Sequence, residues 1–285
     1  MSLVSATRLS NPPGVREPSS AAGVTHLAPW LVAATLTIAV LATSTSLLGL
    51  NASWPYASET ENWRRQAQGQ DAGNLIAVVV LLVGLVGARR GSLRGVQLWL
   101  GSLMYLAYAF VIYSVAVHFG PLFLPYVVTL GLSAYAVLFG VRGWSGGATV
   151  APRARALGAW VLAVIASGFA TLWLASIVGA LASGEPPAEL TEAGLVANPV
   201  HVLDLALVLP GMLISAVRAL THRPGSDLWL APWLVFAALM AASIVAAMLL
   251  ASAPIAPLLV LVAITLVSGV VAVIVLASTA EPTRR

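Results

Sequence analysis

Eight long runs of apolar residues, separated by short polar segments, make up most of the chain. A helix needs about 20 apolar residues to cross the hydrocarbon core of a bilayer, and each run is close to that length or longer. The pattern therefore predicts an all-α fold, a polytopic transmembrane helix bundle of eight helices. The predicted spans are 28–50, 72–89, 96–118, 121–141, 156–183, 200–218, 229–251 and 255–278.

The segments outside these spans are short, so we expect a single transmembrane domain over residues 28–278. Residues 1–27 are rich in Ser, Pro and Gly and are predicted to be a disordered tail, since such a composition cannot bury enough apolar surface to fold. Residues 279–285 form a second short tail. The first span is longer than the core of a signal peptide, and no cleavage pattern follows it, so we interpret it as a helix of the mature protein.

The positions of the arginines predict the orientation of the bundle. Cytoplasmic loops of membrane proteins carry an excess of basic residues. With the N-terminus inside, only Arg64 and Arg65 fall in outer segments, and twelve arginines fall in cytoplasmic ones. We therefore expect both termini to be cytoplasmic. The twelve are Arg8, Arg16, Arg89, Arg90, Arg94, Arg142, Arg153, Arg155, Arg218, Arg223, Arg284 and Arg285.

The composition agrees with this interpretation and excludes several kinds of chemistry. Charged residues make up only 8% of the chain, whereas soluble domains have about 25%. The absence of Cys excludes disulfides and thiolate metal sites, and the absence of Lys excludes a retinal Schiff base. Abundant Ala, Val, Leu and Arg without Lys indicate a bacterial source, so we expect the bacterial cytoplasmic membrane. The basic charge lies in the short cytoplasmic segments and does not indicate nucleic-acid binding.

The second half of the chain resembles the first at an offset of 130 to 134 residues. The runs that begin at residues 28, 69 and 121 resemble those that begin at 158, 202 and 254, in the same order. This alignment places Asp71 opposite Asp204 and Ser92 opposite Ser226. It predicts two parallel repeats, 28–141 and 156–278, related by an axis along the membrane normal. The alternative is chance similarity between apolar segments.

The stretch "NPVHVLDLALVLPGMLISAVRAL", residues 198–220, places an acid inside a predicted span. Asn198 and Pro199 are typical of a helix start, and Asp204 lies five residues further on, too deep to cap that start. A carboxylate inside a bilayer costs up to about 3 kcal/mol. His201 is one turn away on the same face. The pair is interpreted either as a structural pair or as a ligand, proton or metal site, and Pro210 is expected to kink the helix.

Other polar residues map to the same half of the predicted bundle. Asp71 and Asn74 lie at the start of the second span, where an Asp usually caps the first turn. His118 ends the third span and Tyr126 begins the fourth. The tyrosines of the third span are typical of core packing, although buried hydroxyls need partners. We therefore predict a ligand-binding cluster open to the outside, made of Asp204, His201, Asp71, Asn74, His118 and Tyr126.

Residues 69–137, with "GQDAGNL", "ARRGS", the Tyr-rich "YLAYAFVIYSVAVHFG" and "PLFLPY", together with "NPVHVLDLALVLP" at 198–210, carry a resemblance. The chain is similar there to a family of uncharacterised bacterial multi-pass membrane proteins. It departs from that pattern at Ala109 and Gly120, where similar proteins have Asn. The resemblance implies an integral membrane protein and assigns no activity.

Three kinds of function stay open. The first is binding or transport of a small ligand or ion at the cluster around Asp204. The second is a membrane-embedded metal or haem protein or enzyme, with His118, His201, Asp204 and Asp71 as candidate ligands, although no hydrolase or metalloprotease motif is present. The third is a non-catalytic membrane partner or sensor, whose arginine loops suit anionic lipid headgroups. Apart from the lipid bilayer, the sequence specifies no partner, cofactor or metal.

Overall fold

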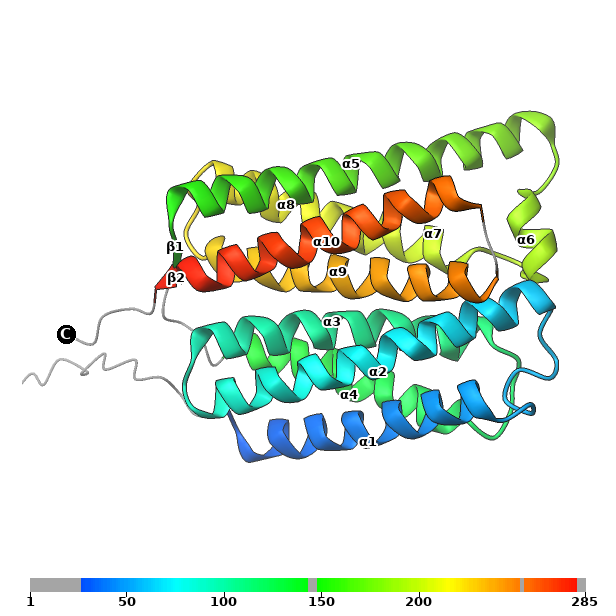
Figure 1. The fold of residues 1–285 in the computed structure, drawn as a ribbon, viewed down its shortest axis with the longest axis horizontal. Helices are drawn as coiled ribbons and strands as arrows, with labels where there is room; N and C mark the ends of the chain where they lie inside the picture. The colour runs from blue at the N-terminus through cyan, green and yellow to red at the C-terminus, as the bar shows by residue number, and fades with distance from the viewer. Residues whose placement is uncertain (1–26, 143–147, 252–253, 281–285) are drawn as a thin grey trace, which may run out of the picture.

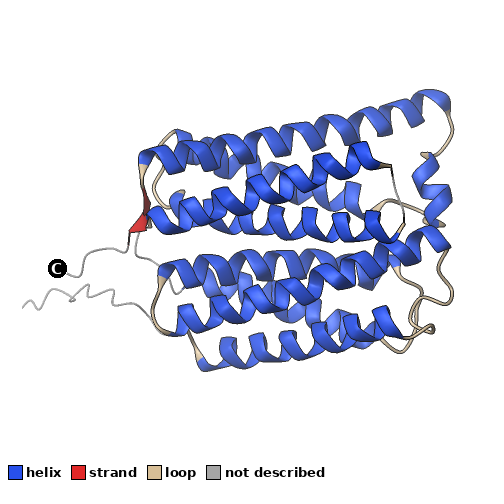
Figure 2. Cartoon of the chain, in the orientation of Figure 1, coloured by secondary structure: helices blue, strands red, loops and turns tan. Residues whose placement is uncertain are grey.

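The computed structural model of the chain describes residues 27–142, 148–251 and 254–280. In this part of the chain eight helical segments are long and apolar enough to cross a membrane, so the predicted number of spans is confirmed. Figures 1 and 2 show them lying roughly side by side. They are α1 (Pro29–Asn51), α2 (Glu61–Arg89), α3 (Leu93–Ala116), α4 (Phe123–Arg142), α5 (Pro152–Ser183), the composite of α7 (Pro199–Leu203), η1 (Asp204–Val208) and α8 (Leu209–Leu220), α9 (Asp227–Leu250) and α10 (Ile255–Ser278).

The largest departure from the predicted spans is at the start of α2. The apolar run begins at residue 72, but the helix begins at Glu61, and the Thr60 side chain caps it by accepting a hydrogen bond from the Trp63 N–H at 3.2 Å. An apolar window misses these first turns because they are polar. Asp71 therefore lies well inside α2, and the expectation that it caps this helix is wrong.

Three small elements lie outside the spans. A short helix, α6 (Ala188–Ala193), lies between α5 and α7, and β1 (Thr149–Val150) pairs antiparallel with β2 (Thr279–Ala280). The first two residues of the predicted C-terminal tail are thus paired with the α4–α5 connection. The predicted disordered tail falls, except for Leu27, on residues outside the described part of the chain.

The helices pack as two groups of four. In one group α2 and α4 each pack against both α1 and α3. In the other group α5 and α9 each pack against α8 and α10. We call these groups the N-half and the C-half, and α9 joins them by packing against α2 and α3 (Figure 1).

Small residues allow α2 and α9 to approach closely. A Cβ atom at Gly69 would collide with Ala247 of α9, and one at Gly73 would collide with Ser243. Each pair is separated by four residues, which is one turn of helix. This is the spacing at which small residues bring membrane helices into contact.

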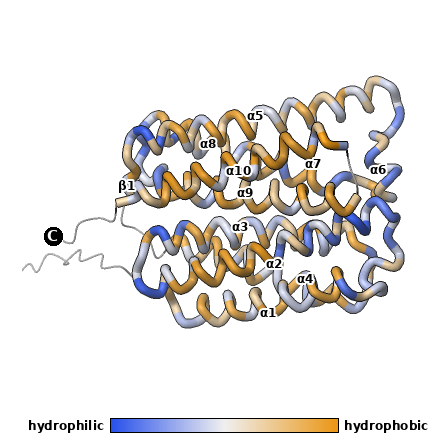
Figure 3. Tube along the Cα trace, in the orientation of Figure 1, coloured by the Kyte–Doolittle hydropathy of each residue, from blue (hydrophilic) through white to orange (hydrophobic). Residues whose placement is uncertain are grey.

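The two ends of the bundle differ. The end that carries β1 and β2, here called the termini end, holds an ion pair in which Arg155 donates from Nε and Nη2 to the two Asp227 oxygens, each at 2.8 Å. The Val150 N–H also donates to Asp227, at 2.7 Å. The opposite end carries α6 and is called the α6 end. Figure 3 shows hydrophilic positions concentrated towards both ends and apolar residues dominating between them.

Large apolar side chains also cover the outside of the bundle. Val40, Val164, Leu207 and Val273 each expose more than half of their surface. Exposed apolar surface of this extent is unfavourable in water, and it suits helices that face lipid. Together with the eight spans, it supports a multi-pass membrane protein.

Candidate functional site

The sixth span is broken where its acid lies. Asn198 caps α7 as expected, accepting hydrogen bonds from the N–H groups of Val200 at 3.0 Å and His201 at 3.3 Å. Six residues after Asn198 the helix widens into the π-turn η1, in which the Leu209 N–H donates to the Asp204 carbonyl. Pro210 follows and has no N–H to donate. Single π-turns inside α-helices occur often at functional sites, and this one begins at Asp204.

Asp204 points from η1 towards α3 and α5. Its carboxyl accepts hydrogen bonds from the Tyr108 hydroxyl of α3 at 3.0 Å and from the Trp173 indole N–H of α5 at 2.8 Å. Two donors from two different helices therefore fix the orientation of the carboxyl.

His201 and Asp204 share a helix face in the sequence, but in the described part of the chain no hydrogen bond joins their side chains. The His201 ring instead lies against the Trp173 ring, with centroids 4.5 Å apart. The buried His201 Nε2 atom has no hydrogen-bond partner among the described residues. His201 therefore contacts Trp173, whose N–H holds Asp204, and reaches the carboxyl only indirectly.

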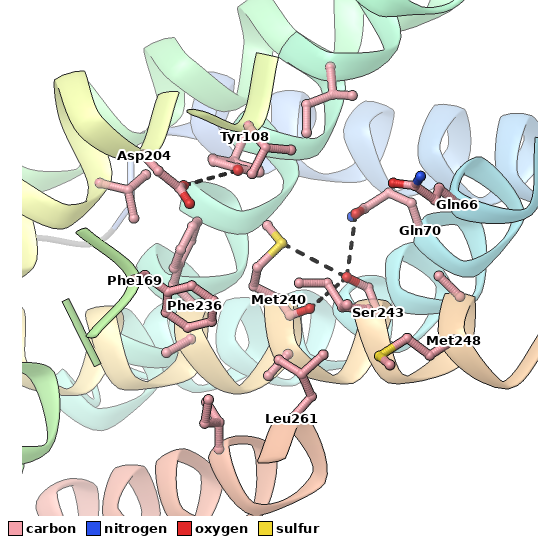
Figure 4. Close-up of a pocket in the computed structure, with 18 of the residues that line it drawn as sticks. Gln66, Gln70, Tyr108, Phe169, Asp204, Phe236, Met240, Ser243, Met248 and Leu261 are labelled. Atoms are coloured by element: carbon pink, nitrogen blue, oxygen red, sulfur yellow. Dashed lines mark hydrogen bonds between the residues drawn. The ribbon is translucent and has the colours of Figure 1, made fainter. Parts of the chain in front are cut away.

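A cavity of about 370 Å³ lies between the N-half and the C-half, towards the α6 end. Asp204 is the one charged residue among the described residues that line it. Figure 4 shows Asp204 and Tyr108 at one side of the cavity, Gln66 and Gln70 at the other, and Met240 between them. The Ser243 hydroxyl lies 3.4 Å from the side-chain oxygen of Gln70 and 2.8 Å from the Met240 carbonyl oxygen.

The other walls of the cavity are apolar and aromatic. Figure 4 shows Phe169 of α5, Phe236 of α9 and Tyr108 of α3 around the side that holds Asp204. Trp173 of α5 also lines the cavity and donates a hydrogen bond to Asp204. Pockets for small molecules are typically mostly apolar, with a few polar groups that fix the orientation of the ligand. Both the volume and the lining of this cavity fit that description.

Asp71 forms a second site within the N-half. It is 1% exposed, and its two carboxyl oxygens contact the hydroxyls of Tyr56 at 2.7 Å and Tyr113 at 2.8 Å. Burial raises the pKa of the Tyr56 hydroxyl, so this group keeps its proton and donates to Asp71. Gly49 of α1 leaves the room for this arrangement, because a Cβ there would collide with the carboxyl of Asp71.

Asn74 and Tyr126 belong to this second site. The Asn74 amide donates to the Ser46 hydroxyl at 3.1 Å and to the Tyr113 hydroxyl at 3.4 Å. The Tyr126 ring stacks on Tyr113, with centroids 4.9 Å apart. Neither Asn74 Oδ1 nor the Tyr126 hydroxyl has a partner among the described residues, although both atoms are buried.

His118 lies apart from both sites. It follows the end of α3, pairs with Glu59 at 2.9 Å and exposes 62% of its side chain. The six residues of the predicted cluster are therefore distributed over three places. In the part of the chain that is described, no group of three or more His, Asp and Glu side chains could hold a metal ion.

Two partners of the acids were not singled out from the sequence. Trp173 lies 31 positions before Asp204, and Tyr56 lies in a connection 15 positions before Asp71. Neither spacing places the two residues on one helix face, so no periodicity could have paired them. Tyr108 and Tyr113 belong to the tyrosine stripe of α3, where the need of buried hydroxyls for partners was the available signal.

The fold thus defines a multi-helix membrane protein with one cavity-facing acid and one sealed acid. No known protein family, characterised protein or solved structure matches the chain. Functional assignment therefore depends on the chemistry of these two sites.

Proposed function

We propose that this protein binds a small, largely apolar organic cation in the cavity between its two halves and carries it across the membrane. The observation that supports this most directly is the cavity of about 370 Å³ whose described lining includes one acid, Asp204, and no basic residue. An anion placed there would meet a carboxylate with no basic group among those lining residues. A cation would meet its counter-charge.

The aromatic wall favours the same class of ligand. Tyr108, Phe169, Trp173 and Phe236 lie around the side of the cavity that holds Asp204. A cation within about 6 Å of an aromatic face gains about 0.5–2 kcal/mol, and more when it is desolvated. Met240 and Met248 add unbranched side chains that adapt to the shape of an apolar ligand.

We also propose that the two halves are parallel repeats with both termini in the cytoplasm. Three features support the repeat. Gly91 and Gly225 follow α2 and α8, 225 − 91 = 134 positions apart, with φ of 78° and 74°. Gly101 packs against Val235, again 134 positions away, as expected for counterparts beside a two-fold axis. The two halves are offset by 133 positions at Asp71 and Asp204 and by 134 positions at Gly91 and Gly225, so the second half has one extra residue between these points. The π-turn η1, which begins at Asp204, accommodates that residue.

The orientation follows from the basic residues at the two ends of the bundle. In the described part of the chain, Arg64 and Arg65 lie at the start of α2, at the α6 end, and the other arginines lie at or near the ends of helices at the termini end. A cytoplasmic termini end satisfies the positive-inside rule. The cavity would then face the outside of a bacterial cytoplasmic membrane. A cavity between two repeats is where carriers bind their substrates, and movement of one repeat against the other alternates access to it.

Tetraphenylphosphonium, a lipophilic monovalent cation, tests the binding site. Trp63 and Trp173 line the cavity, so tryptophan fluorescence of the purified protein reports binding there. We expect tetraphenylphosphonium to bind and the neutral triphenylphosphine oxide to bind at least tenfold more weakly. Asp204→Asn should weaken binding of the cation at least tenfold, about 1.4 kcal/mol. Uptake of tetraphenylphosphonium by proteoliposomes should exceed the passive uptake of protein-free liposomes, and this excess should be lost in the same variant.

Glu61→Gln is the matched control, because it removes an exposed acid at the same end of the bundle that does not line the cavity. It should keep both affinity and uptake. Equal binding of the neutral compound, or unchanged affinity in Asp204→Asn, would exclude Asp204 as the cation site. Binding without uptake in the unmodified protein would exclude the carrier part of the proposal.

A further inference from the structure

Asp71 is a fully buried acid without a basic partner in the described part of the chain. It is 1% exposed, and the ion pairs there involve other acids: Glu59, Glu61 and Asp227. An ionised carboxylate in such a place is costly unless hydrogen bonds or a cation compensate its charge. The contacts around Asp71 therefore determine its protonation state.

The number of hydrogens available to the contacts of the Tyr113 hydroxyl indicates that state. The Tyr113 oxygen lies 3.1 Å from the Ala67 carbonyl oxygen, 2.8 Å from Asp71 Oδ1 and 3.4 Å from the Asn74 amide nitrogen. A phenol has one hydrogen to donate, and a carbonyl and an ionised carboxylate are both acceptors. If Asp71 were ionised, one of the two oxygen–oxygen contacts, at 2.8 Å and 3.1 Å, would contain no hydrogen.

A proton on Asp71 satisfies all three contacts. Asp71 then donates to Tyr113, Tyr113 donates to the Ala67 carbonyl, and the Asn74 amide donates to Tyr113. The second oxygen of Asp71 accepts from Tyr56 at 2.7 Å. A neutral carboxylic acid also suits an apolar interior better than a charged one.

The groups that face Asp71 do not supply a positive charge. They are the phenols of Tyr56 from the α1–α2 connection, Tyr105 and Tyr113 from α3, and Tyr126 from α4, while α1 contributes Ser46 and Gly49. The carboxylate of Glu59 interacts electrostatically with the Tyr126 hydroxyl and is paired with His118.

Tyr113 also connects this site to the cavity. Tyr113 and Ala67 both belong to the cavity lining, and Gln70, the neighbour of Asp71 in sequence, lines it too. The partnerless oxygen atoms of Asn74 and Tyr126 lie beside Tyr113 and give its hydroxyl alternative partners when it turns. The side chain of Tyr113 therefore provides a route for a proton between Asp71 and the cavity.

We infer that Asp71 is a proton-binding site that exchanges its proton with the cavity through Tyr113. In the exchange the proton of Asp71 moves to the Tyr113 oxygen, while the hydroxyl proton of Tyr113 passes to a water molecule in the cavity. Asp71 is left as a carboxylate that accepts hydrogen bonds from Tyr56 and Tyr113, and the water becomes hydronium. The site is distinct from the cation site at Asp204 and does not depend on the proposed ligand.

Infrared spectroscopy of the lipid-reconstituted protein tests this inference directly. A protonated carboxylic acid gives a carbonyl stretching band that an ionised one lacks, and the band shifts when its hydrogen is replaced by deuterium. We expect such a band at neutral pH, lost in Asp71→Asn and kept in Asp204→Asn. In Tyr113→Phe the band should remain, but its deuterium exchange should slow at least tenfold relative to the unmodified protein.

Labelling with dicyclohexylcarbodiimide gives a second readout that needs no variant, because this apolar reagent modifies protonated carboxyls. Mass spectrometry of the labelled protein should place the adduct on Asp71. A missing band together with unlabelled Asp71 would overturn the inference, as would stabilisation of the protein by sodium but not by choline, since a metal cation would then neutralise the carboxylate. Exchange as fast in Tyr113→Phe as in the unmodified protein would exclude the route through Tyr113.

Discussion

Asp71 and Asp204 lie on helices that start at the same end of the bundle, yet their surroundings differ. The carboxyl of Asp71 is enclosed by the four helices of the N-half, whereas that of Asp204 borders the cavity and keeps part of its surface exposed. Both contact tyrosine hydroxyls of α3 at hydrogen-bonding distance. The difference therefore comes from how closely the neighbouring helices approach.

Small residues explain that difference in approach. Gly69 and Gly73 let α2 pack directly against α9. The proposed repeat aligns these glycines with Val202 and Ala206 of the sixth span, 133 residues on, and both of these residues are exposed. The sixth span packs mainly against α5 and makes fewer contacts with α9, which leaves the cavity between them. Two similar helices thus give a sealed acid in one half and an accessible acid in the other.

The largest effect is expected from breaking the close contact of α2. In Gly73→Leu the new side chain would collide with Ser243 and with the Tyr105 hydroxyl, so α2 must move away from α9. Overpacking of this kind costs about 3 kcal/mol, measured by thermal unfolding of the detergent-purified protein. Gly168→Leu is the control, because nothing lies within 4 Å of a Cβ atom added there, and it should change the stability by less than about 0.5 kcal/mol. Equal effects of the two changes would show that glycine packing does not hold α2 against α9.

The sequence predicted the number of spans and the start of the sixth one. Span number follows from the length of apolar runs, which a bilayer requires whatever the packing. The caps at Asn198 and Pro199 follow from local chemistry. The polar beginning of α2 was missed because no apolar signal marks it, and this error placed Asp71 at a helix end where it does not lie.

The predicted polar cluster shows what a sequence cannot specify. The depth of each polar residue along its helix follows from the sequence, but the rotation of each helix about its own axis does not. Asp71, Asn74 and Tyr126 turn into the N-half, Asp204 faces the cavity, and His118 lies beyond the end of α3. Periodicity gives the face of one helix, and the pairing of faces depends on helix packing.

Removal of one hydroxyl from each site sharpens the comparison. Tyr113→Phe removes one hydrogen-bond partner from each of the Ala67 carbonyl, Asp71 and Asn74 in a sealed site, so we expect a loss of about 1–3 kcal/mol of stability. Tyr108→Phe removes one donor from Asp204, but Trp173 still donates and cavity water can replace the hydroxyl. Its cost should stay below about 1 kcal/mol. Denaturant titration of both variants measures the difference, and an equal cost would contradict the distinction between a sealed and an open acid.

The smallest effect on stability is expected from filling the cavity. Ala241 of α9 lines it, so the ring of Ala241→Phe should occupy space that the ligand needs without displacing a helix. We expect tetraphenylphosphonium to bind about tenfold more weakly, about 1.4 kcal/mol, while the thermal midpoint is unchanged or higher because apolar surface is buried. Ala175→Phe, on the exposed face of α5, is the matched control and should keep full affinity. If Ala241→Phe binds the cation as tightly as the unmodified protein, the ligand does not occupy this cavity, and Asp204 must be held by Tyr108 and Trp173 for a structural reason alone.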